Sequence, residues 1–356
     1  AWLKLLADQG ACVMAVGDDD QSIYAFRGAN SGNMLSFETD FAIEKVVKLE
    51  QNYRSLGNIL DGANALIKNN DGRLGKNLWT DQGEGEPIRV FRAMTDGEEA
   101  TFIIEEIQAL RNSGIELKNI ALLYRSNAQS RILEHGLFSS GLPYKVYGGL
   151  RFFERQEVKH ALAYLRLIAN SEDDGALLRI INFPTRGIGN RTIEHIRDLA
   201  ERTGTSLWQA ACSAPLSGRA VTAVTSFITL IEKLKNETSG FSLPDLIEHS
   251  IESSGLIEHY QKDRDGQDRL ENLNELINAA SAFSTERADI PSLEAQMANG
   301  ADEDFNATEI DPLVDFLAHA SLEAGDNQAS AGEDALQLMT VHAAKGLEFH
   351  SVFISG

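Results

Sequence analysis

Cysteine is nearly absent from this sequence, and long hydrophobic runs are absent altogether. The chain of 356 residues has two cysteines, Cys12 in an apolar strand-like run and Cys212 in a helix-like run. So few cysteines exclude a disulfide-rich secreted domain, and we expect both thiols to be buried in a protein of the reducing cytoplasm. No apolar run approaches the ~20 residues that span a bilayer, so we expect no membrane partner.

Basic residues are scarce as well. The formal net charge is −21, and between Arg287 and Lys345 there is no Lys or Arg, whereas the same stretch holds 12 Asp and Glu. A negative chain disfavours a nucleic-acid partner at first sight. Because more than half of the excess negative charge lies in one stretch, a groove elsewhere can still be locally positive. The kind of partner must therefore be inferred from motifs.

Strand-like and helix-like runs alternate over the first 149 residues. Strand-like runs occupy residues 12–17, 42–55, 87–95, 119–126 and 143–149, and helical patterns occupy residues 1–10, 57–70, 97–114 and 127–141, the last with Asn127 as N-cap. This alternation predicts an α/β fold with a mostly parallel sheet. Helical patterns then dominate until residues 335–356 return to strand–turn–strand, which predicts a helical domain inserted into the α/β domain.

The stretch GDDDQSIYAFRGAN (17–30) combines three carboxylates with aromatic residues directly after a strand-like run. In open α/β sheets, ligands bind beyond the carboxyl ends of strands. Gln21 has both a donor and an acceptor and can follow whether a phosphate is present. Tyr24 and Phe26, next to Arg27, suit the stacking of unpaired bases. The alternative is an acidic turn whose aromatic side chains pack into the core.

A second strand-like run ends in LEQNYRS (49–55). The guanidinium of Arg54 can bind a phosphate bidentately and stabilise charge on a transferring phosphoryl group. Tyr53 offers a flat ring on which a nucleobase can stack. Taken alone, the tetrapeptide NYRS is weak evidence for a nucleotide site, because Arg54 could equally pair with the carboxylates of Asp18–Asp20.

The third stretch, LMTVHAAKGLEF (338–349), again places polar residues after a strand-like run. Gly346 permits a tight backbone, Lys345 supplies a point charge, and Glu348 can accept a hydrogen bond from a ribose hydroxyl. A lone histidine such as His342 is more often a packed histidine than a ligand. No Cys or His cluster accompanies it, so we expect no metal site.

Together, in this order and spacing, the three stretches resemble motifs III, IV and V of the UvrD/Rep/PcrA-type superfamily I DNA helicases, closest to the UvrD branch. The resemblance continues through LLYRSNAQSR (122–131) and YGGLRFFERQEVKHALAYLRLI (147–168), so it covers essentially the whole chain. It implies a RecA-like, P-loop NTPase-type parallel sheet interrupted by a mostly helical domain. The implied domains are the end of domain 1A (1–48), domain 2A (49–148 and 326–356) and the inserted 2B domain (149–325), with an acidic mobile loop over about 284–312.

The resemblance also implies roles for single residues. Gln21 and Arg54 act as catalytic groups at the γ-phosphate of ATP, and Tyr53 stacks on the adenine. Lys345, Gly346 and Glu348 lie near the nucleotide. The residues implied to contact single-stranded DNA are Tyr24, Phe26 (often Trp in the family, so a smaller stacking face here), Arg27, Arg125, Asn127, Arg131 and His342.

A further element, NFPTRGIGNRTIEHI (182–196), lies in the helical region. Pro184 is expected to end a helix, two glycines to form a tight turn, and Thr192 to cap the helix that follows. Glycines let backbone N–H groups approach a phosphate closely, although a plain helix–helix turn is the alternative. The resemblance implies duplex contacts by Arg186, Gly187, Ile188, Gly189 and Thr192.

No phosphate-binding loop of the form G-x-x-x-x-G-K-[ST] occurs in the sequence. On the resemblance, that loop, the carboxylates that hold Mg²⁺ and a last arginine motif lie outside it. We therefore interpret the chain as an internal fragment, inactive alone, of an ATP-dependent 3′–5′ DNA helicase of excision repair, mismatch repair or replication restart. The implied partners are single-stranded DNA, duplex–single-strand junctions and repair proteins. The alternatives are a non-catalytic DNA-binding or partner-recruiting module and a helicase–nuclease, although no nuclease carboxylate set is visible.

Overall fold

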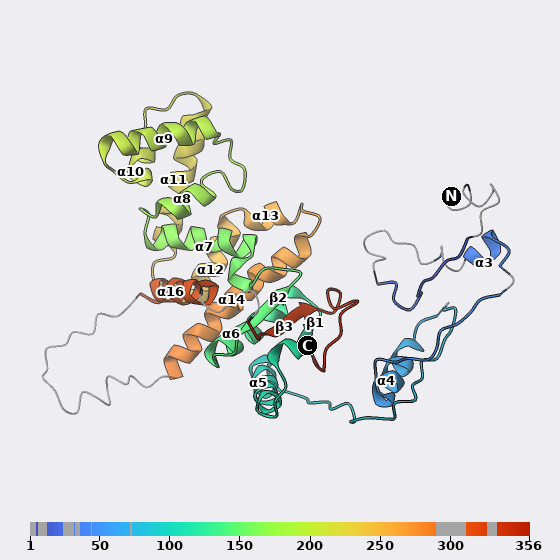
Figure 1. Cartoon of the computed structure of the whole chain (residues 1–356). Helices are drawn as coiled ribbons and strands as arrows, with labels where there is room; N and C mark the ends of the chain where they lie inside the picture. Colours follow the sequence, from blue (N-terminus) through green and yellow to red (C-terminus); the bar gives the residue numbers. More distant parts are fainter. Residues whose placement is uncertain are drawn as a thin grey trace, which may run out of the picture. The chain divides into compact units, whose positions relative to one another are not determined.

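The computed structural model (Figure 1) describes residues 5, 13–23, 32, 36–43, 45–71, 73–289, 311–325 and 333–356. They belong to two compact units, Ala1–Arg92 and Ala93–Gly356, and each unit is described by itself. Among these residues, none of the helices has the length and apolar character needed to cross a membrane.

The second unit is built on a parallel four-stranded sheet with the order β2-β3-β1-β4. The strands are β1 (Ile120–Tyr124), β2 (Tyr144–Tyr147), β3 (Leu336–Thr340) and β4 (Ser351–Ser355). In the central register, Leu122 lies beside Leu338 on one side and Phe353 on the other. Strands from before and after the helical segment thus alternate in one sheet, and the predicted parallel α/β sheet is confirmed.

Two helices pack on each other and share one apolar core with this sheet. They are α5 (Asp96–Asn112) and α6 (Ser130–Ser139), and the short turns η2 (Leu117–Asn119) and η3 (Asn127–Gln129) precede β1 and α6. Helix α5 begins where the Thr95 hydroxyl accepts from the Glu98 amide at 3.2 Å, and it is followed by Gly114, whose φ of 97° suits glycine. The core contains Ile107, Leu122 and Leu137, all fully buried. This core therefore joins β1 to the two helices.

The helical segment forms a second, larger core. Its helices are α7 (Gln156–Ala169), α8 (Asp174–Ile180), α9 (Asn190–Thr203), α10 (Leu207–Ser213), α11 (Arg219–Glu237), α12 (Leu243–Ser253), α13 (Leu256–Tyr260), α14 (Gly266–Asp289) and α16 (Pro312–Gly325), after the turn η4 (Phe152–Glu154). Helix α7 is central, because almost its whole surface is buried against α8, α11, α12, α14 and α16. The helices of this region therefore pack as one bundle within the second unit.

A histidine in this core makes the stability of the fold depend on pH. The ring of His160 stacks on Phe183 with centroids 3.7 Å apart, and its Nδ1 lies 2.7 Å from the hydroxyl of Tyr260. Burial, helped by the positive charge of Arg179, lowers the pKa of His160 to about 4. In the unfolded chain the imidazole titrates near ~6.5.

We expect stability to fall as the pH drops from about 6.5 to about 4, because the unfolded chain then binds a proton that the folded chain does not. His160→Gln should remove this component, with a steepest slope of about 1.4 kcal/mol per pH unit. Urea unfolding of both proteins from pH 4 to 7 measures it. Parallel pH profiles for the two proteins would contradict the prediction.

The strands predicted at 12–17, 42–55 and 87–95 are wrong for the residues of those ranges that the structure describes. The first unit has helices α3 (Phe37–Asp40) and α4 (Gly57–Ile67), and its described residues contain one isolated parallel bridge, between Gln51 and Trp79. A strand needs lateral hydrogen bonds to a neighbour, and an apolar pattern does not supply one. Val90, for example, remains 91% exposed.

Several smaller predictions also need correction. Residues 284–289, assigned to an acidic loop, continue α14, and residues 290–310 lie outside the described residues. Asn127 does not cap the helix that follows it: it lies inside η3, which is capped by the Ser126 hydroxyl accepting from the Ala128 amide, and the residue before α6 is Gln129. Cys212 is exposed because it lies on the outer side of α10. Cys12 and almost all of the helix expected at 1–10 fall outside the described residues.

Candidate functional site

The acidic turn that contains Gln21 is fastened to a segment about fifty residues later. Arg73 donates two hydrogen bonds of 2.7 Å to the carboxylate of Asp20, and this hydrogen bonding lowers the pKa of Asp20. Asp19 accepts from the amide of Leu74 at 2.8 Å, and Asp18 pairs with Lys76. The three carboxylates are thus engaged by residues 73–76, and Arg54 is not needed as their partner.

Gln21 lies at the exposed end of this turn. Its Nε2 donates to Oδ2 of Asp18 at 2.6 Å, so the side-chain amide is oriented by a carboxylate that is itself paired. The neighbouring residues implied to stack on DNA, Tyr24, Phe26 and Arg27, lie outside the described residues.

The Tyr53–Arg54 turn is organised by one asparagine. Oδ1 of Asn52 accepts from the amides of Arg54 and Ser55, both at 2.8 Å, which is an Asx-type turn. The Tyr53 hydroxyl donates to Oε1 of Gln51 at 2.8 Å, and the tyrosine is 71% exposed. An exposed ring beside an exposed guanidinium can receive a planar base and a phosphate. The motif alone assigned no role to Asn52, although asparagine before a turn is a recognisable signal of an Asx turn.

In the second unit, three loops meet at the carboxyl edge of the sheet, where parallel strands deliver them. The loop after β1 contains Arg125 and Asn127. A Cβ placed on Gly149, after β2, would lie 4.0 Å from Oδ1 of Asn127, and one on Gly148 would lie 3.3 Å from Cβ of Ala343, after β3. The structure therefore brings the predicted residues of these loops to one edge.

The loop after β3 holds a compact turn. Oγ1 of Thr340 accepts from the amide of Ala343 at 3.2 Å, and Gly346 has a φ of 91°, a conformation that L side chains rarely adopt. Lys345 and Glu348 are exposed on this turn, whereas His342 is half-buried. The turn can present a cation and an acceptor together to a ligand.

The glycine-containing turn before α9 is held from inside. Oδ1 of Asn182 accepts from the amides of Arg186 (2.9 Å) and Ile188 (3.0 Å), and Ile188 is buried. Gly187 has a φ of 81°, and a Cβ on either Gly187 or Gly189 would meet no atom within 4 Å. The turn therefore has an open outer side. The Thr192 amide bonds to the carbonyl oxygen of Gly189 at 3.0 Å, whereas the amides of Asn190 and Arg191 precede the first carbonyl acceptor of the helix. The cap of α9 is Gly189, so the prediction that Thr192 caps this helix is wrong.

Comparison with known proteins decides the family. The family profile of the UvrD-like helicase C-terminal domain matches residues 47–356, and that of the UvrD/REP helicase N-terminal domain matches residues 1–42. The chain belongs to the UvrD-like helicase family. Its parallel sheet is thus the RecA-like sheet implied by the motifs.

Curated relatives match the chain from end to end. DNA helicase II of Escherichia coli (strain K12) is 48% identical over 100% of this chain and 48% of its own length. The same-named protein of Haemophilus influenzae is 46% identical over 100% of this chain and 47% of its own length. ATP-dependent DNA helicase PcrA of Leuconostoc citreum is 38% identical, over 99% of this chain and 46% of its own length. The chain therefore spans about half the length of these relatives.

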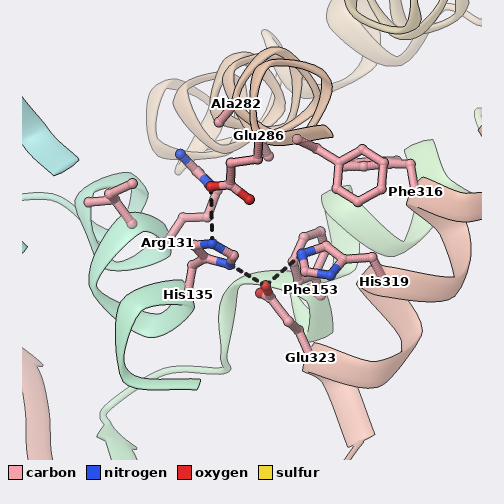
Figure 2. Close-up of a pocket in the computed structure, with 11 residues that line it drawn as sticks. Arg131, His135, Phe153, Ala282, Glu286, Phe316, His319 and Glu323 are labelled. Carbon is pink, nitrogen blue, oxygen red and sulfur yellow. Dashed lines mark hydrogen bonds and ion pairs between the residues drawn. The ribbon is translucent and has the colours of Figure 1, made fainter. Parts of the chain in front are cut away.

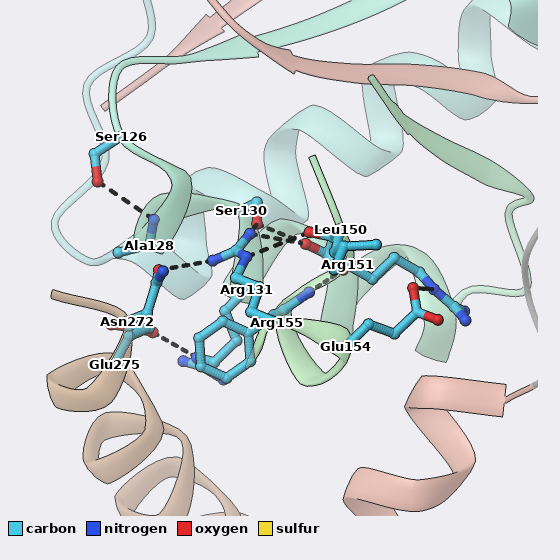
Figure 3. Close-up of polar contacts among 12 residues, drawn as sticks. Ser126, Ala128, Ser130, Arg131, Leu150, Arg151, Glu154, Arg155, Asn272 and Glu275 are labelled. Atoms are coloured by element: carbon cyan, nitrogen blue, oxygen red, sulfur yellow. Dashed lines mark hydrogen bonds and ion pairs between the residues drawn. The ribbon is translucent and has the colours of Figure 1, made fainter. Parts of the chain in front are cut away.

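Two arginines implied to contact DNA are turned inward in this UvrD-like chain. Arg131 is 8% exposed, and its Nε donates to Oε1 of Glu275 on α14 (Figure 3). The guanidinium of Arg186 donates to the carbonyl oxygens of Ile180 (3.1 Å), Pro184 (3.1 Å) and Ser254 (3.0 Å). A phosphate contact by either guanidinium would break these bonds, so the geometry favours positioning roles for both.

A buried polar network, missed from the sequence, locks the start of α6 to the helical segment (Figure 3). Arg155, 7% exposed, donates to Oγ of Ser130 at 2.7 Å and to Oδ1 of Asn272 at 2.8 Å. Oγ of Ser130 donates in turn to Glu134 at 2.5 Å, and Glu134 also accepts from the amide of Phe152 at 3.1 Å. Burial raises the pKa of Glu134. The network holds the base of the loop that carries Arg125 and Asn127.

Proposed function

We propose that this chain is part of an ATP-dependent DNA helicase that translocates 3′ to 5′ on single-stranded DNA in repair or replication restart. The observation that carries the proposal is the Tyr53–Arg54 turn, fixed by Asn52 with both side chains exposed, in a chain of the UvrD-like family. Residues 1–48 would end the first RecA-like domain. Residues 49–148 and 326–356 would form the second, and residues 149–325 the inserted 2B domain.

Exposed groups suited to ATP occur in each unit when it is taken by itself. Tyr53 would stack on the adenine and Arg54 would reach the γ-phosphate, whose presence Gln21 would sense. Lys345, Gly346 and Glu348 would lie toward the phosphates and ribose, as the turn after β3 allows.

Mg²⁺ does not fit the Asp18–Asp20 carboxylates, because these are engaged by Arg73, Lys76 and a backbone amide. Its ligands and the phosphate loop would belong to the rest of the protein.

Single-stranded DNA would run along the carboxyl edge of the sheet. Arg125 and Asn127 would contact its phosphates, and His342, half-buried in the same turn as Lys345, would link DNA to nucleotide state. Tyr24, Phe26 and Arg27 are likewise proposed to contact single-stranded DNA. Repair proteins would be further partners of the full-length protein.

Duplex DNA ahead of the junction would lie against the turn before α9. The contact would be made by backbone amides around Gly187, Ile188 and Gly189, because the Arg186 guanidinium is bonded inside the chain. Amides bind phosphates without reading bases.

Gly189→Thr should weaken binding of a duplex–single-strand junction by the full-length protein. Gly189 has a φ of −84° and open space around its Cβ position, so threonine adds bulk outward without backbone strain. Loss of one hydrogen bond to a charged group predicts a decrease of about 10-fold or more in junction affinity, similar for unrelated sequences. Fluorescence anisotropy with labelled junctions measures it.

The matched control lies at the other end of the same helix. Gly204 has a φ of 65° and equally open surroundings, so Gly204→Thr carries the strain of a left-handed residue without touching the proposed contact. We expect it to bind junctions normally. Single-strand affinity should be unchanged in both variants, and a Gly189→Thr protein that loses both affinities equally would contradict the assignment.

Strand separation by the full-length protein tests the function itself. ATP hydrolysis should depend on single-stranded DNA, and a duplex with a 3′ single-stranded tail should be unwound while one with a 5′ tail is not. Binding of DNA without hydrolysis would favour a non-catalytic DNA-binding module.

A further inference from the structure

Two histidines and two glutamates from three helices meet beside a small cavity of the second unit (Figure 2). Nδ1 of His135, on α6, lies 2.6 Å from Oε1 of Glu323, on α16. Nε2 of His319, one turn earlier on α16, lies 2.8 Å from the same oxygen. The three ligand atoms are within 4.8 Å of one another, and Glu323 is 7% exposed. None of these residues belongs to the proposed ATP or DNA contacts.

We propose that His135, His319 and Glu323 bind a divalent transition-metal ion, with Zn²⁺ as the best match. Two imidazoles and one carboxylate are a donor set that zinc accepts, with a fourth position left for water. The ligand atoms need to be about 3.3 Å apart around a tetrahedral zinc, given bonds of ~2.0–2.2 Å. Oε1 of Glu323 now lies 2.6 Å from Nδ1 of His135 and 2.8 Å from Nε2 of His319, and the two nitrogens lie within 4.8 Å of each other. Small side-chain rotations would therefore admit the ion.

Glu286, on α14, supplies the outer contact that such a site requires. Its Oε1 lies 3.4 Å from Nε2 of His135, on the opposite side of the ring from Glu323. A carboxylate there keeps the proton on Nε2 and leaves the Nδ1 lone pair for the metal. The metal would displace the protons that now lie between the histidine nitrogens and Glu323 and release them to solvent.

Charge and space are consistent with this ion. With both imidazoles neutral, Glu323 and Glu286 carry two negative charges, which one divalent cation balances. Arg131 also lines the cavity, but its charge is matched by Glu275. The cavity of about 20 Å³ has room for the single water of the fourth position. The bound ion would fasten α16 and, through Glu286, α14 to α6.

Zinc titration of the full-length protein, stripped with a chelator and free of a histidine tag, tests the site. Against a chromophoric competitor, the unaltered protein should bind one more Zn²⁺ than Glu323→Gln, and His319→Ala should behave like Glu323→Gln. Glu286→Gln should retain the ion with about 10–100-fold lower affinity. The control is His249→Ala, which removes an exposed His–Glu pair (3.0 Å to Glu237) and should bind like the unaltered protein.

A second measurement does not depend on the folding of any variant. Co²⁺ added to the unaltered protein should give the intense visible bands of a four-coordinate site, and Zn²⁺ should abolish them. Equal zinc stoichiometry in the unaltered protein and Glu323→Gln, or a weak octahedral Co²⁺ spectrum, would overturn the proposal.

Discussion

Arg54→Ala in the full-length protein is expected to lower the DNA-stimulated kcat for ATP hydrolysis by about 10³–10⁵-fold. The reason is that a guanidinium at the γ-phosphate acts mainly on charge that develops in the transition state. Asn52 fixes the backbone of Arg54 through a 2.8 Å hydrogen bond, and the Arg54 side chain is exposed. Steady-state hydrolysis with saturating single-stranded DNA measures the effect.

Tyr53→Ala should have a different signature. Stacking serves the ground state and the transition state alike, so KM for ATP should rise by about 10-fold while kcat changes little. Arg92→Ala, at an exposed arginine of the same unit, is the matched control and should leave both constants unchanged. Normal turnover by Arg54→Ala would remove Arg54 from catalysis. A structural ion pair with Asp18–Asp20 would not then account for Arg54, since Arg73 already pairs with Asp20 and Lys76 with Asp18.

The sheet of the second unit could be predicted because its pattern and its partners are both in the chain. Strands β1 and β3 are buried on both faces and read as continuous apolar runs, as central parallel strands do. The runs at 12–17 and 87–95 look similar, but their described residues have no neighbouring strand to pair with. Pairing is a long-range property, and no local pattern encodes it.

The candidate site was predictable where chemistry depends on the backbone and not where it depends on distant partners. The turns of Arg54 and Gly346 follow from Asn52 and from a glycine with a positive φ, both local signals. By contrast, the sequence of a motif does not tell whether its arginine side chain faces solvent or the protein interior. Arg131 turns inward because α14, more than a hundred residues later, presents Glu275.

Arg155→Ala should lower the local stability around α6 and α7 by about 3–5 kcal/mol, because it leaves a buried carboxylate without its cation. Arg155 lies just before α7 and lies 3.8 Å from Oε1 of Glu134, a residue that is 4% exposed. The substitution would also remove the donors to Ser130 and Asn272. Hydrogen exchange of peptides that cover α6 and α7 measures the opening free energy. Arg166→Ala, at an exposed position of α7 bonded to Ser321, is the control and should change it by about 0.5 kcal/mol or less.

The pH dependence separates the buried charge from the lost packing. Burial holds the pKa of Glu134 above its ordinary value of 4.5, and loss of Arg155 should raise this pKa further. A buried carboxyl whose pKa is raised in the folded protein destabilises the fold least when it is protonated. The loss of local stability caused by Arg155→Ala should therefore be small near pH 5 and grow toward pH 8. Adding Glu134→Gln should recover about 1–3 kcal/mol at pH 8, since an amide needs no cation. A deficit that is equal at both pH values, and unchanged by Glu134→Gln, would show that Arg155 contributes packing alone.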